Sequence, residues 1–151
     1  MEIRNAVHPN HAVHFDTAQL REHFLIQDLF KPDQVKLVYS YFDRLIVGGM
    51  CPVTLLKLEV DEKIIGAPFL LQRREMGVIN IGGAGIITID GESYSLSPRD
   101  GLYIGMGAKD LEFSSADPGN PARFYINCAP AHAHYPNAQI TFDQAEPTEL
   151  G

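Results

Sequence analysis

The stretch VINIGGAGIITIDGESYSL, Val78–Leu96, places a cluster of glycines directly after an apolar run. A dinucleotide phosphate loop needs a helix directly after its glycines, because the N-terminus of that helix supplies free N–H groups to the anion. Here two β-prone runs, IITI and ESYSL, flank Asp90-Gly91, which predicts a hairpin whose two turn residues take positive φ. We therefore predict β-structure in place of a nucleotide site, with Gly83 and Gly85 letting the strand bend towards the hairpin.

Length and composition indicate one globular domain. The chain has 151 residues, of which 45% are hydrophobic, enough for a substantial core. Its net charge of −7 is spread along the chain without a basic cluster, so neither a nucleic acid nor a membrane is an expected partner. The N-terminus lacks the apolar core of a signal peptide. We expect a cytoplasmic protein in which Cys51 and Cys128 are reduced, buried thiols.

The predicted elements are one helix followed by many short strands. The helix is expected to begin at Asp16 or Thr17, since Asp16 and Gln19 have the spacing of a capping box. Branched and aromatic runs then alternate with turn residues such as Gly48-Gly49. The predicted strands are residues 35–42, 44–47, 55–60, 78–81, 86–89, 92–96, 102–104, 111–113 and 123–127. This pattern favours an antiparallel sandwich or barrel over residues 1–142, followed by a linker or tail over 143–151.

Two patterns compare with the sequence signatures of cupin barrels. Glu75 and Gly82 keep the spacing that ends the first signature, but the two histidines expected before Glu75 are missing. Their places, in the two possible registers, hold Pro68 and Leu70 or Phe69 and Leu71. Residues 105–110 resemble the second signature, with Asp110 where its histidine belongs. Because zinc or iron is held chiefly by imidazole nitrogens, we predict an all-β, antiparallel, cupin-like jelly-roll β-barrel with a short N-terminal helix and no metal at the usual site.

Histidines also occur near the N-terminus. His8, His11 and His14 lie three residues apart, but Pro9 disfavours a helix across them. We interpret this segment as a polar arm that packs on the barrel or on a partner.

A second histidine pair, His132 and His134, would present two imidazoles on one face if the chain there is extended. Pro130 and Pro136 bracket the pair, however, and no carboxylate follows at the spacing of a ligand. Two interpretations stay open, namely surface or interface histidines, and a ligand or acid–base role.

The run Arg73-Arg74-Glu75 places successive charges on opposite faces of a strand. Inside a barrel, an arginine together with Glu75 is able to clamp the carboxylate of a sugar acid, which makes Arg73 and Arg74 candidate substrate-binding residues. The alternative is an internal ion pair in place of the missing metal site. Three aromatic residues are expected in the core. They are Tyr103, Phe124 and Tyr125.

Five long segments resemble the 5-keto-4-deoxyuronate isomerase family, also called the 4-deoxy-L-threo-5-hexosulose-uronate ketol-isomerases. The segments are HFDTAQLREHFL, YFDRLIVGGMCPVT, RREMGVINIGGAGIITIDGESY, RDGLYIGMGAKDLEF and PARFYINCAPAHAHYP. They are free of gaps and differ from general cupin sequence, so the resemblance is specific. It runs essentially from one end of the chain to the other.

This resemblance implies an isomerase of pectin and polyuronide breakdown. The family converts the aldehyde of 5-keto-4-deoxyuronate to the ketone of 3-deoxy-D-glycero-2,5-hexodiulosonate by moving a proton between C2 and C1. An enediolate forms on the way, and a metal or positioned donors stabilise it. The resemblance further implies a cytoplasmic, zinc-containing homohexamer of two-cupin subunits.

The chain departs from this family in one respect. The zinc ligands of the family lie in a second cupin half that this sequence does not contain, so no zinc ligand carries over to any residue here. The match is to the N-terminal, metal-free half, and we expect a second cupin domain and further copies of the chain as partners.

Three hypotheses for function follow. In the first, the chain serves the uronate isomerase, and the chemistry takes place in the second barrel. In the second, it is a non-catalytic cupin module for oligomer assembly or sugar-carboxylate binding. In the third, it is a small enzyme that uses His132, His134 and Glu75.

Overall fold

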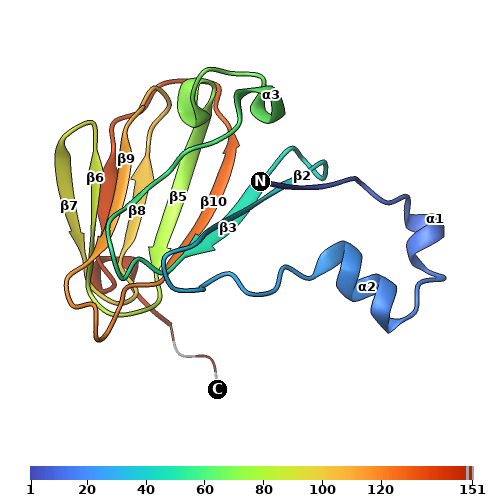
Figure 1. Cartoon of the computed structure of the whole chain (residues 1–151), viewed down its shortest axis with the longest axis horizontal. Coiled ribbons are helices and arrows are strands. Elements are labelled where there is room, and N and C mark those ends of the chain that lie inside the picture. Colours follow the sequence, from blue (N-terminus) through green and yellow to red (C-terminus); the bar gives the residue numbers. More distant parts are fainter. Residues whose placement is uncertain (149, 151) are drawn as a thin grey trace.

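Two β-sheets face each other in the computed structural model, which describes residues 1–148 and 150 (Figure 1). The seven-stranded sheet has the order β1-β2-β3-β10-β5-β8-β11, and the four-stranded sheet has the order β4-β9-β6-β7. The strands are β1 (Glu2–Arg4), β2 (Val35–Ser40), β3 (Ile46–Met50), β4 (Leu56–Lys57), β5 (Arg74–Asn80), β6 (Gly85–Ile89), β7 (Glu92–Leu96), β8 (Gly101–Ile104), β9 (Leu111–Ser115), β10 (Phe124–Pro130) and β11 (Ala138–Ile140). The helices are α1 (Pro9–Ala12), α2 (Thr17–Phe24) and α3 (Glu62–Ile65), with 3-10 turns η1 (Leu70–Gln72) and η2 (Asp143–Ala145).

The strand pairing identifies the fold as a jelly roll. From β3 to β10 the strands pair in a nested order, with β3 on β10, β4 on β9, β5 on β8 and β6 on β7, and all these pairs are antiparallel. Nested pairing of this kind wraps eight strands into two Greek keys that share one core. The predicted all-β jelly-roll class is confirmed. One pair, β1 on β2, is parallel and lies at the edge of the larger sheet.

The hairpin predicted in the opening stretch is present. Strands β6 and β7 pair across Asp90-Gly91, and the φ angles of these two residues are 50° and 90°. The Asp90 carboxylate also accepts hydrogen bonds from the backbone N–H groups of Lys109 and Asp110, at 3.1 and 2.9 Å. The turn is therefore bonded to the loop that precedes β9 as well as to its own hairpin.

The core fills the space between the two sheets. Its largest fully buried side chains include Phe113 from the smaller sheet and Phe124 from the larger one, whose ring centroids lie 5.5 Å apart. Cys51 and Cys128 are both buried and are not joined in a disulfide. The core prediction for Phe124 is confirmed, whereas Tyr103 and Tyr125 are only half-buried because they lie on the outward-facing positions of their strands.

Glycines near the hairpin permit close packing. A Cβ atom added to Gly83 would collide with the backbone carbonyl of Asn120, and one added to Gly85 would lie 2.5 Å from the Phe124 ring. Neither glycine has a positive φ. The chain bends at Gly82 and Gly83 between β5 and β6, as predicted for Gly83. Gly85 lies inside β6, so the predicted bend is wrong for this residue, which instead provides room for the Phe124 ring.

The Gly48-Gly49 turn is also a wrong prediction. Both glycines lie inside strand β3, where a Cβ atom on Gly49 would lie 2.8 Å from the Phe30 ring. Glycine in a strand marks close approach of another segment as often as it marks a turn. The short strands β1 and β11 and helix α3 were not predicted, since none has enough residues to show a period.

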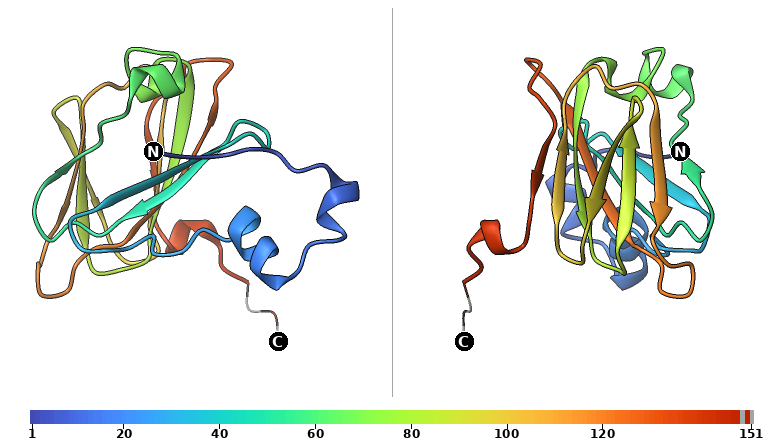
Figure 2. Two further views of the ribbon diagram at one scale, coloured as in Figure 1. Left: turned by 45° about the vertical axis from the view of Figure 1, so that its right-hand side comes forward. Right: turned by 90° about the vertical axis from the view of Figure 1, so that its left-hand side faces the viewer.

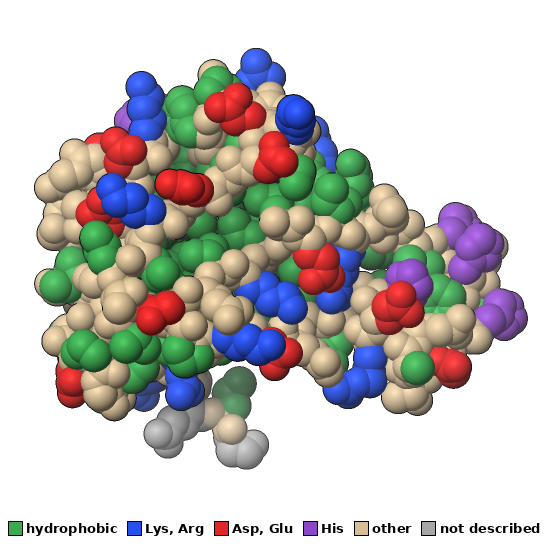
Figure 3. Space-filling view, in the orientation of Figure 1, with side chains coloured by type: hydrophobic (Ala, Val, Ile, Leu, Met, Phe, Trp, Pro, Cys, Tyr) green, Lys and Arg blue, Asp and Glu red, His purple; other side chains and the backbone are tan. Residues whose placement is uncertain are grey.

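The N-terminal arm, residues 5–25, extends away from the barrel (Figures 1 and 2). Helix α2 starts after Asp16, whose side chain accepts from the Gln19 N–H at 2.8 Å in the predicted capping box. Pro9 begins helix α1 at a position that tolerates proline, and because the helix ends at Ala12 it does not span His8, His11 and His14, as predicted. Histidine side chains gather over this arm (Figure 3). The end of the arm does contact the barrel, since the centroids of the Phe24 and Phe42 rings lie 6.0 Å apart and Arg4 of β1 donates to the His23 carbonyl at 3.5 Å. Contact of the arm with a partner stays a prediction.

The C-terminal segment follows β11 on the larger sheet. Phe142 donates its N–H to Asp100 at 2.9 Å, and its ring lies 3.7 Å from the Arg99 guanidinium carbon. The predicted linker over 143–151 lies partly outside the described residues, at positions 149 and 151. Across the described residues, the structure contains no helix that is long and apolar enough to cross a membrane.

Candidate functional site

The positions of the cupin signatures do not form a metal site. Leu70 and Leu71 are buried in the apolar core, and Asp110 is exposed at the far end of its loop. Within residues 1–148 and 150, no three His, Cys, Asp or Glu side chains lie close enough together to hold a metal ion. The described residues therefore do not fit a zinc ion, which needs three or four converging nitrogen, sulfur or oxygen ligands.

Glu75 lies on the outer face of the larger sheet. It accepts a hydrogen bond from the Tyr103 hydroxyl at 2.8 Å, and burial together with this bond raises the pKa of Tyr103 to about 12. In the described part of the chain, no ion pair joins Glu75 to Arg73 or Arg74. The predicted internal ion pair is wrong, and so is a clamp that Glu75 shares with Arg74, because adjacent strand residues face opposite sides.

His132 and His134 lie in the exposed loop after β10. Nδ1 of His134 is 2.6 Å from the Met106 carbonyl oxygen, and Nε2 of His132 is 3.3 Å from the Tyr135 hydroxyl. Tyr135 in turn acts electrostatically on Tyr103, which raises the pKa of Tyr103 further. His132 and His134 thus contact different partners, the Tyr135 hydroxyl and the Met106 carbonyl. An acid–base role for these residues stays a prediction.

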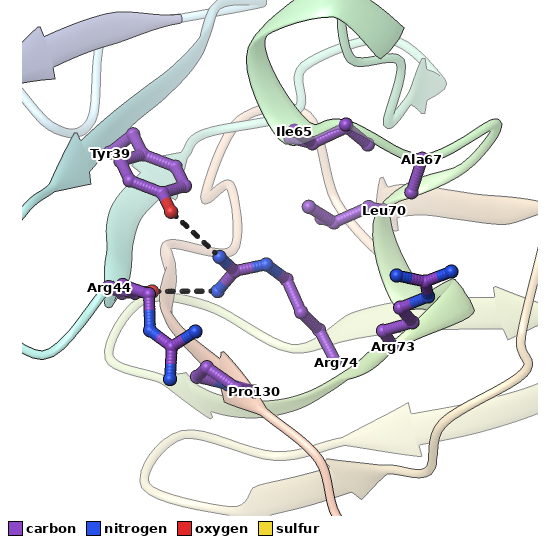
Figure 4. Close-up of a pocket in the computed structure, with 9 residues that line it drawn as sticks. Tyr39, Arg44, Ile65, Ala67, Leu70, Arg73, Arg74 and Pro130 are labelled. Atoms are coloured by element: carbon purple, nitrogen blue, oxygen red, sulfur yellow. Dashed lines mark hydrogen bonds between the residues drawn. The ribbon is translucent and has the colours of Figure 1, made fainter.

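Arg73 and Arg74 lie elsewhere, at a pocket at one end of the barrel (Figure 4). The pocket is a cavity of about 200 Å³. Its lining is Tyr39, Arg44, Ile65, Gly66, Ala67, Leu70, Arg73, Arg74 and Pro130. Three arginines and no acidic residue contribute to this lining. The site is therefore cationic on one side and apolar on the other, where helix α3 and the turn before β5 cover it.

Arg74 is the central residue of this pocket. Its side chain points inward from β5, the residue is only 8% exposed, and it donates to the Arg44 carbonyl at 2.7 Å and to the Tyr39 hydroxyl at 3.3 Å. The guanidinium carbon lies 5.2 Å from the centroid of the Tyr39 ring, a cation–π distance. Cys128 lies beside it, and burial raises the pKa of that thiol to about 11 although Arg74 acts in the opposite direction.

Tyr39 and Arg44 were not predicted as site residues from the sequence. They come from the β2–β3 hairpin, and Arg44 precedes Arg74 by 30 residues. Arg44 and the residue before it, Asp43, both have positive φ, at 55° and 52°. A local sequence signal for this pair is weak, since neither is glycine and a two-residue hairpin turn usually contains one.

Two solved structures align with part of this chain. The EutQ protein of Clostridium difficile aligns with 65% of this chain and 62% of its own, at 24% identity and a TM-score of 0.44. The Cnp3 cupin domain of Schizosaccharomyces pombe aligns with 64% of each chain, at 9% identity and a TM-score of 0.48.

Curated relatives are much more similar in sequence. A protein of Lachnoclostridium phytofermentans is 54% identical over 152 residues, and one of Edwardsiella ictaluri is 51% identical over 153 residues. Both are named 4-deoxy-L-threo-5-hexosulose-uronate ketol-isomerase, and in both cases the match covers 100% of this chain and 55% of the relative. The chain spans about half the length of the curated relatives it matches. Because residues 24–151 also match the model of the KduI/IolB family, the chain belongs to the KduI/IolB family.

Proposed function

We propose that this chain serves a 4-deoxy-L-threo-5-hexosulose-uronate ketol-isomerase as its metal-free cupin half. The observation that supports this proposal is 48–54% identity, over the whole of this chain, to relatives that carry that name. The reaction is the aldose–ketose isomerisation of 5-keto-4-deoxyuronate to 3-deoxy-D-glycero-2,5-hexodiulosonate, in the degradation of pectin and other polyuronides. The small-molecule substrate is therefore derived from a uronate.

The reaction moves one proton between C2 and C1 and needs stabilisation of an enediolate. In the proposal, a second cupin domain holds the zinc ion and carries out this step in a cytoplasmic homohexamer. The present chain offers no metal-ligand cluster among its described residues, so no step of the reaction is assigned to a metal on it. Its proposed contribution is to complete the folded and assembled enzyme.

A non-catalytic assembly role is the second candidate, and the N-terminal arm favours it. The arm leaves large apolar side chains uncovered, with Leu20 43%, Phe24 48% and Leu25 39% exposed. Exposed apolar groups that extend from a barrel on a short helix are typical of segments that become buried against a partner. In this role, further copies of the chain or the second cupin domain bury the arm.

Complementation tests the proposed contribution of this chain to the enzyme. The purified chain, the remaining segment of the Lachnoclostridium phytofermentans relative, and their mixture are assayed for conversion of 5-keto-4-deoxyuronate, with zinc measured in each sample. We expect turnover only in the mixture and zinc only where the added segment is present. Turnover that the segment shows equally well without this chain would contradict the proposed contribution to the enzyme.

The same assay tests the third hypothesis. If the chain alone turns over the ketouronate, the double variant His132→Ala and His134→Ala and the single variant Glu75→Gln are compared with it. Loss of activity in these variants, with unchanged thermal unfolding, would support a small independent enzyme. Unchanged activity eliminates that hypothesis.

A further inference from the structure

We infer that the arginine pocket at the end of the barrel binds the carboxylate of a small organic acid, with Arg74 as its principal contact and Arg44 and Arg73 beside it. The inference rests on the residues of the pocket and does not depend on the proposed isomerase activity. If that activity holds, the bound acid belongs to the same chemical class as its substrate and product.

The first observation is a buried cation that lacks a counter-charge. Arg74 is 8% exposed, and its two oxygen acceptors, the Arg44 carbonyl and the Tyr39 hydroxyl, are both neutral. Its other polar neighbour is the Cys128 thiol, whose pKa burial raises, so it too carries no charge near neutral pH. The four ion pairs found in the described part of the chain involve none of Arg44, Arg73 and Arg74. Acidic residues are not scarce, since the chain has 19 of them against 12 Lys and Arg. A buried guanidinium is ordinarily paired with an anion, so an anion from outside the chain is the missing partner.

The second observation is that two further arginines face the same cavity. Arg73 and Arg44 are exposed residues on opposite sides of Arg74, and Figure 4 shows all three around one opening. Each would gain stability from facing an acidic side chain, yet none lines the cavity. A guanidinium has five N–H donors in a planar fork, and Arg74 uses one nitrogen for each of its two oxygen acceptors. Donors are left over for a carboxylate, which matches that fork in shape.

The third observation is that the site is held in place before a ligand arrives. The Arg44 carbonyl that accepts from Arg74 belongs to a turn in which two non-glycine residues have positive φ. Across β10, Pro130 is paired with Arg74, and the Arg73 carbonyl accepts from the Ala131 N–H at 3.0 Å. A fixed guanidinium loses little freedom when it binds an anion, which favours affinity.

The cavity wall argues for an organic acid over an inorganic ion. Ile65, Ala67 and Leu70 lie across the pocket from Arg44, and Pro130 lies beside Arg44 and Arg74 (Figure 4). All four offer carbon surface and no hydrogen-bonding side chain. A phosphate ion has no apolar part to place there, whereas a sugar acid has both a carboxylate and C–H groups. The volume of about 200 Å³ lies below the range typical of drug-sized ligand sites, about 300–1,000 Å³, which suits a small acid.

The test is a binding titration of the purified chain at one fixed salt concentration. The probes are D-galacturonate, D-galactose as the matched neutral sugar, and inorganic phosphate. We expect galacturonate to bind, galactose to show no binding, and phosphate to bind at least fivefold more weakly. Equal binding of galactose would overturn the carboxylate inference, and phosphate binding as tight as that of galacturonate would make this a general anion site and also overturn it.

Variants then assign the contact. Arg74→Met is expected to weaken galacturonate binding at least tenfold and Arg74→Lys severalfold, because lysine keeps the charge and loses the planar fork. Arg123→Gln is the matched control, since it removes one exposed positive charge at the other end of β5's sheet and is expected to leave binding within twofold. Equal affinities in Arg74→Met and Arg123→Gln would overturn the assignment.

A second pair of variants keeps the test decisive if Arg74→Met does not fold. Arg44→Gln and Arg73→Gln change only exposed side chains, so both are expected to fold. Combined, they are expected to weaken galacturonate binding at least fivefold. Unchanged binding in this double variant would remove the arginine pocket as the site. A failed isomerase assay affects none of these outcomes, because binding is measured on this chain alone with an acid that it does not need to convert.

Discussion

Strand β5 carries a buried polar residue at each of its ends, and the two are satisfied in different ways. Asn80, fully buried, donates to the carbonyls of Gly83 and Leu96 at 2.7 and 3.1 Å and accepts from the N–H groups of Gly82 and Arg123 at 3.1 and 3.3 Å. Its amide uses both donors and both acceptor sites. All the hydrogen-bonding groups of Asn80 are therefore satisfied within its end of the barrel.

Arg74 leaves the other end open. It finds neutral oxygens for two of its nitrogens but no negative charge among the described residues, and a cavity remains beside it. Between the two residues, Met76 and Val78 point into the apolar core. The comparison teaches that a buried polar group at a barrel end is a structural element when its hydrogen bonds are complete. It becomes a candidate binding group when a charge is left over.

Among changes at the two ends of β5, removing the Asn80 side chain is expected to lower the free energy of unfolding most. In Asn80→Ala, two backbone carbonyls and two backbone N–H groups lose their partner inside the barrel end. At roughly 1 kcal/mol for each unpaired group, the free energy of unfolding should fall by about 4 kcal/mol. Urea denaturation followed by circular dichroism measures this. A loss below about 1 kcal/mol would show that Asn80 is not the closure of this end.

Titration of Cys128, beside Arg74, gives the next largest effect. Burial raises the pKa of its thiol to about 11, while an unfolded thiol has a pKa of about 8.5. Below the unfolded pKa, both states are protonated and the full stability is present. As pH rises from about 8.5 to 11, only the unfolded chain loses the proton, so the free energy of unfolding falls by roughly 3 kcal/mol.

Denaturation at several pH values from 8 to 11, with Cys128→Ala as the control, isolates this titration from those of lysines and tyrosines. The wild-type chain should lose more stability over this range than the variant does. Parallel stability curves for the two proteins would contradict a raised thiol pKa.

A methyl group at Gly83, in the turn that Asn80 organises, has a smaller effect. The added Cβ atom in Gly83→Ala meets the backbone carbonyl of Asn120, and a backbone group moves only with its loop. We expect a loss of about 2 kcal/mol, typical of overpacking. Gly101→Ala is the matched control, because its Cβ atom would have an ordinary contact of 3.6 Å with the Val78 carbonyl. Equal thermal midpoints for the two variants would show that the turn is not tightly packed.

Replacing Arg74 has the smallest expected effect on stability, although it has a large one on anion binding. Arg74→Met keeps the volume of the side chain and removes a buried charge. Because no carboxylate offsets the cost of burying that charge, the free energy of unfolding should change by less than about 1 kcal/mol. Denaturation in a buffer without carboxylate or phosphate measures this. A loss as large as that of Asn80→Ala would make Arg74 a structural residue like its counterpart.

Local features of the fold were predictable from the sequence. The Asp90-Gly91 hairpin, the Asp16 capping box and the residues of β7 all depend on neighbours within a few positions, and all three are as predicted. The absence of the two cupin-signature histidines before Glu75 could also be read directly from the sequence. Gly48-Gly49 shows the limit, because a glycine that makes a turn and one that admits a neighbouring ring look the same in sequence.

The candidate site shows why tertiary structure was needed. Alternation along β5 placed Arg74 and Glu75 on opposite faces, but it did not indicate which groups stand across from them. Tyr103 and the Arg44 carbonyl reach these residues from strands and turns that lie 28 and 30 positions away in the chain. Sequence periodicity determines which side chains share a face. Only the nested pairing of the strands decides what each face meets, because register depends on contacts between distant segments.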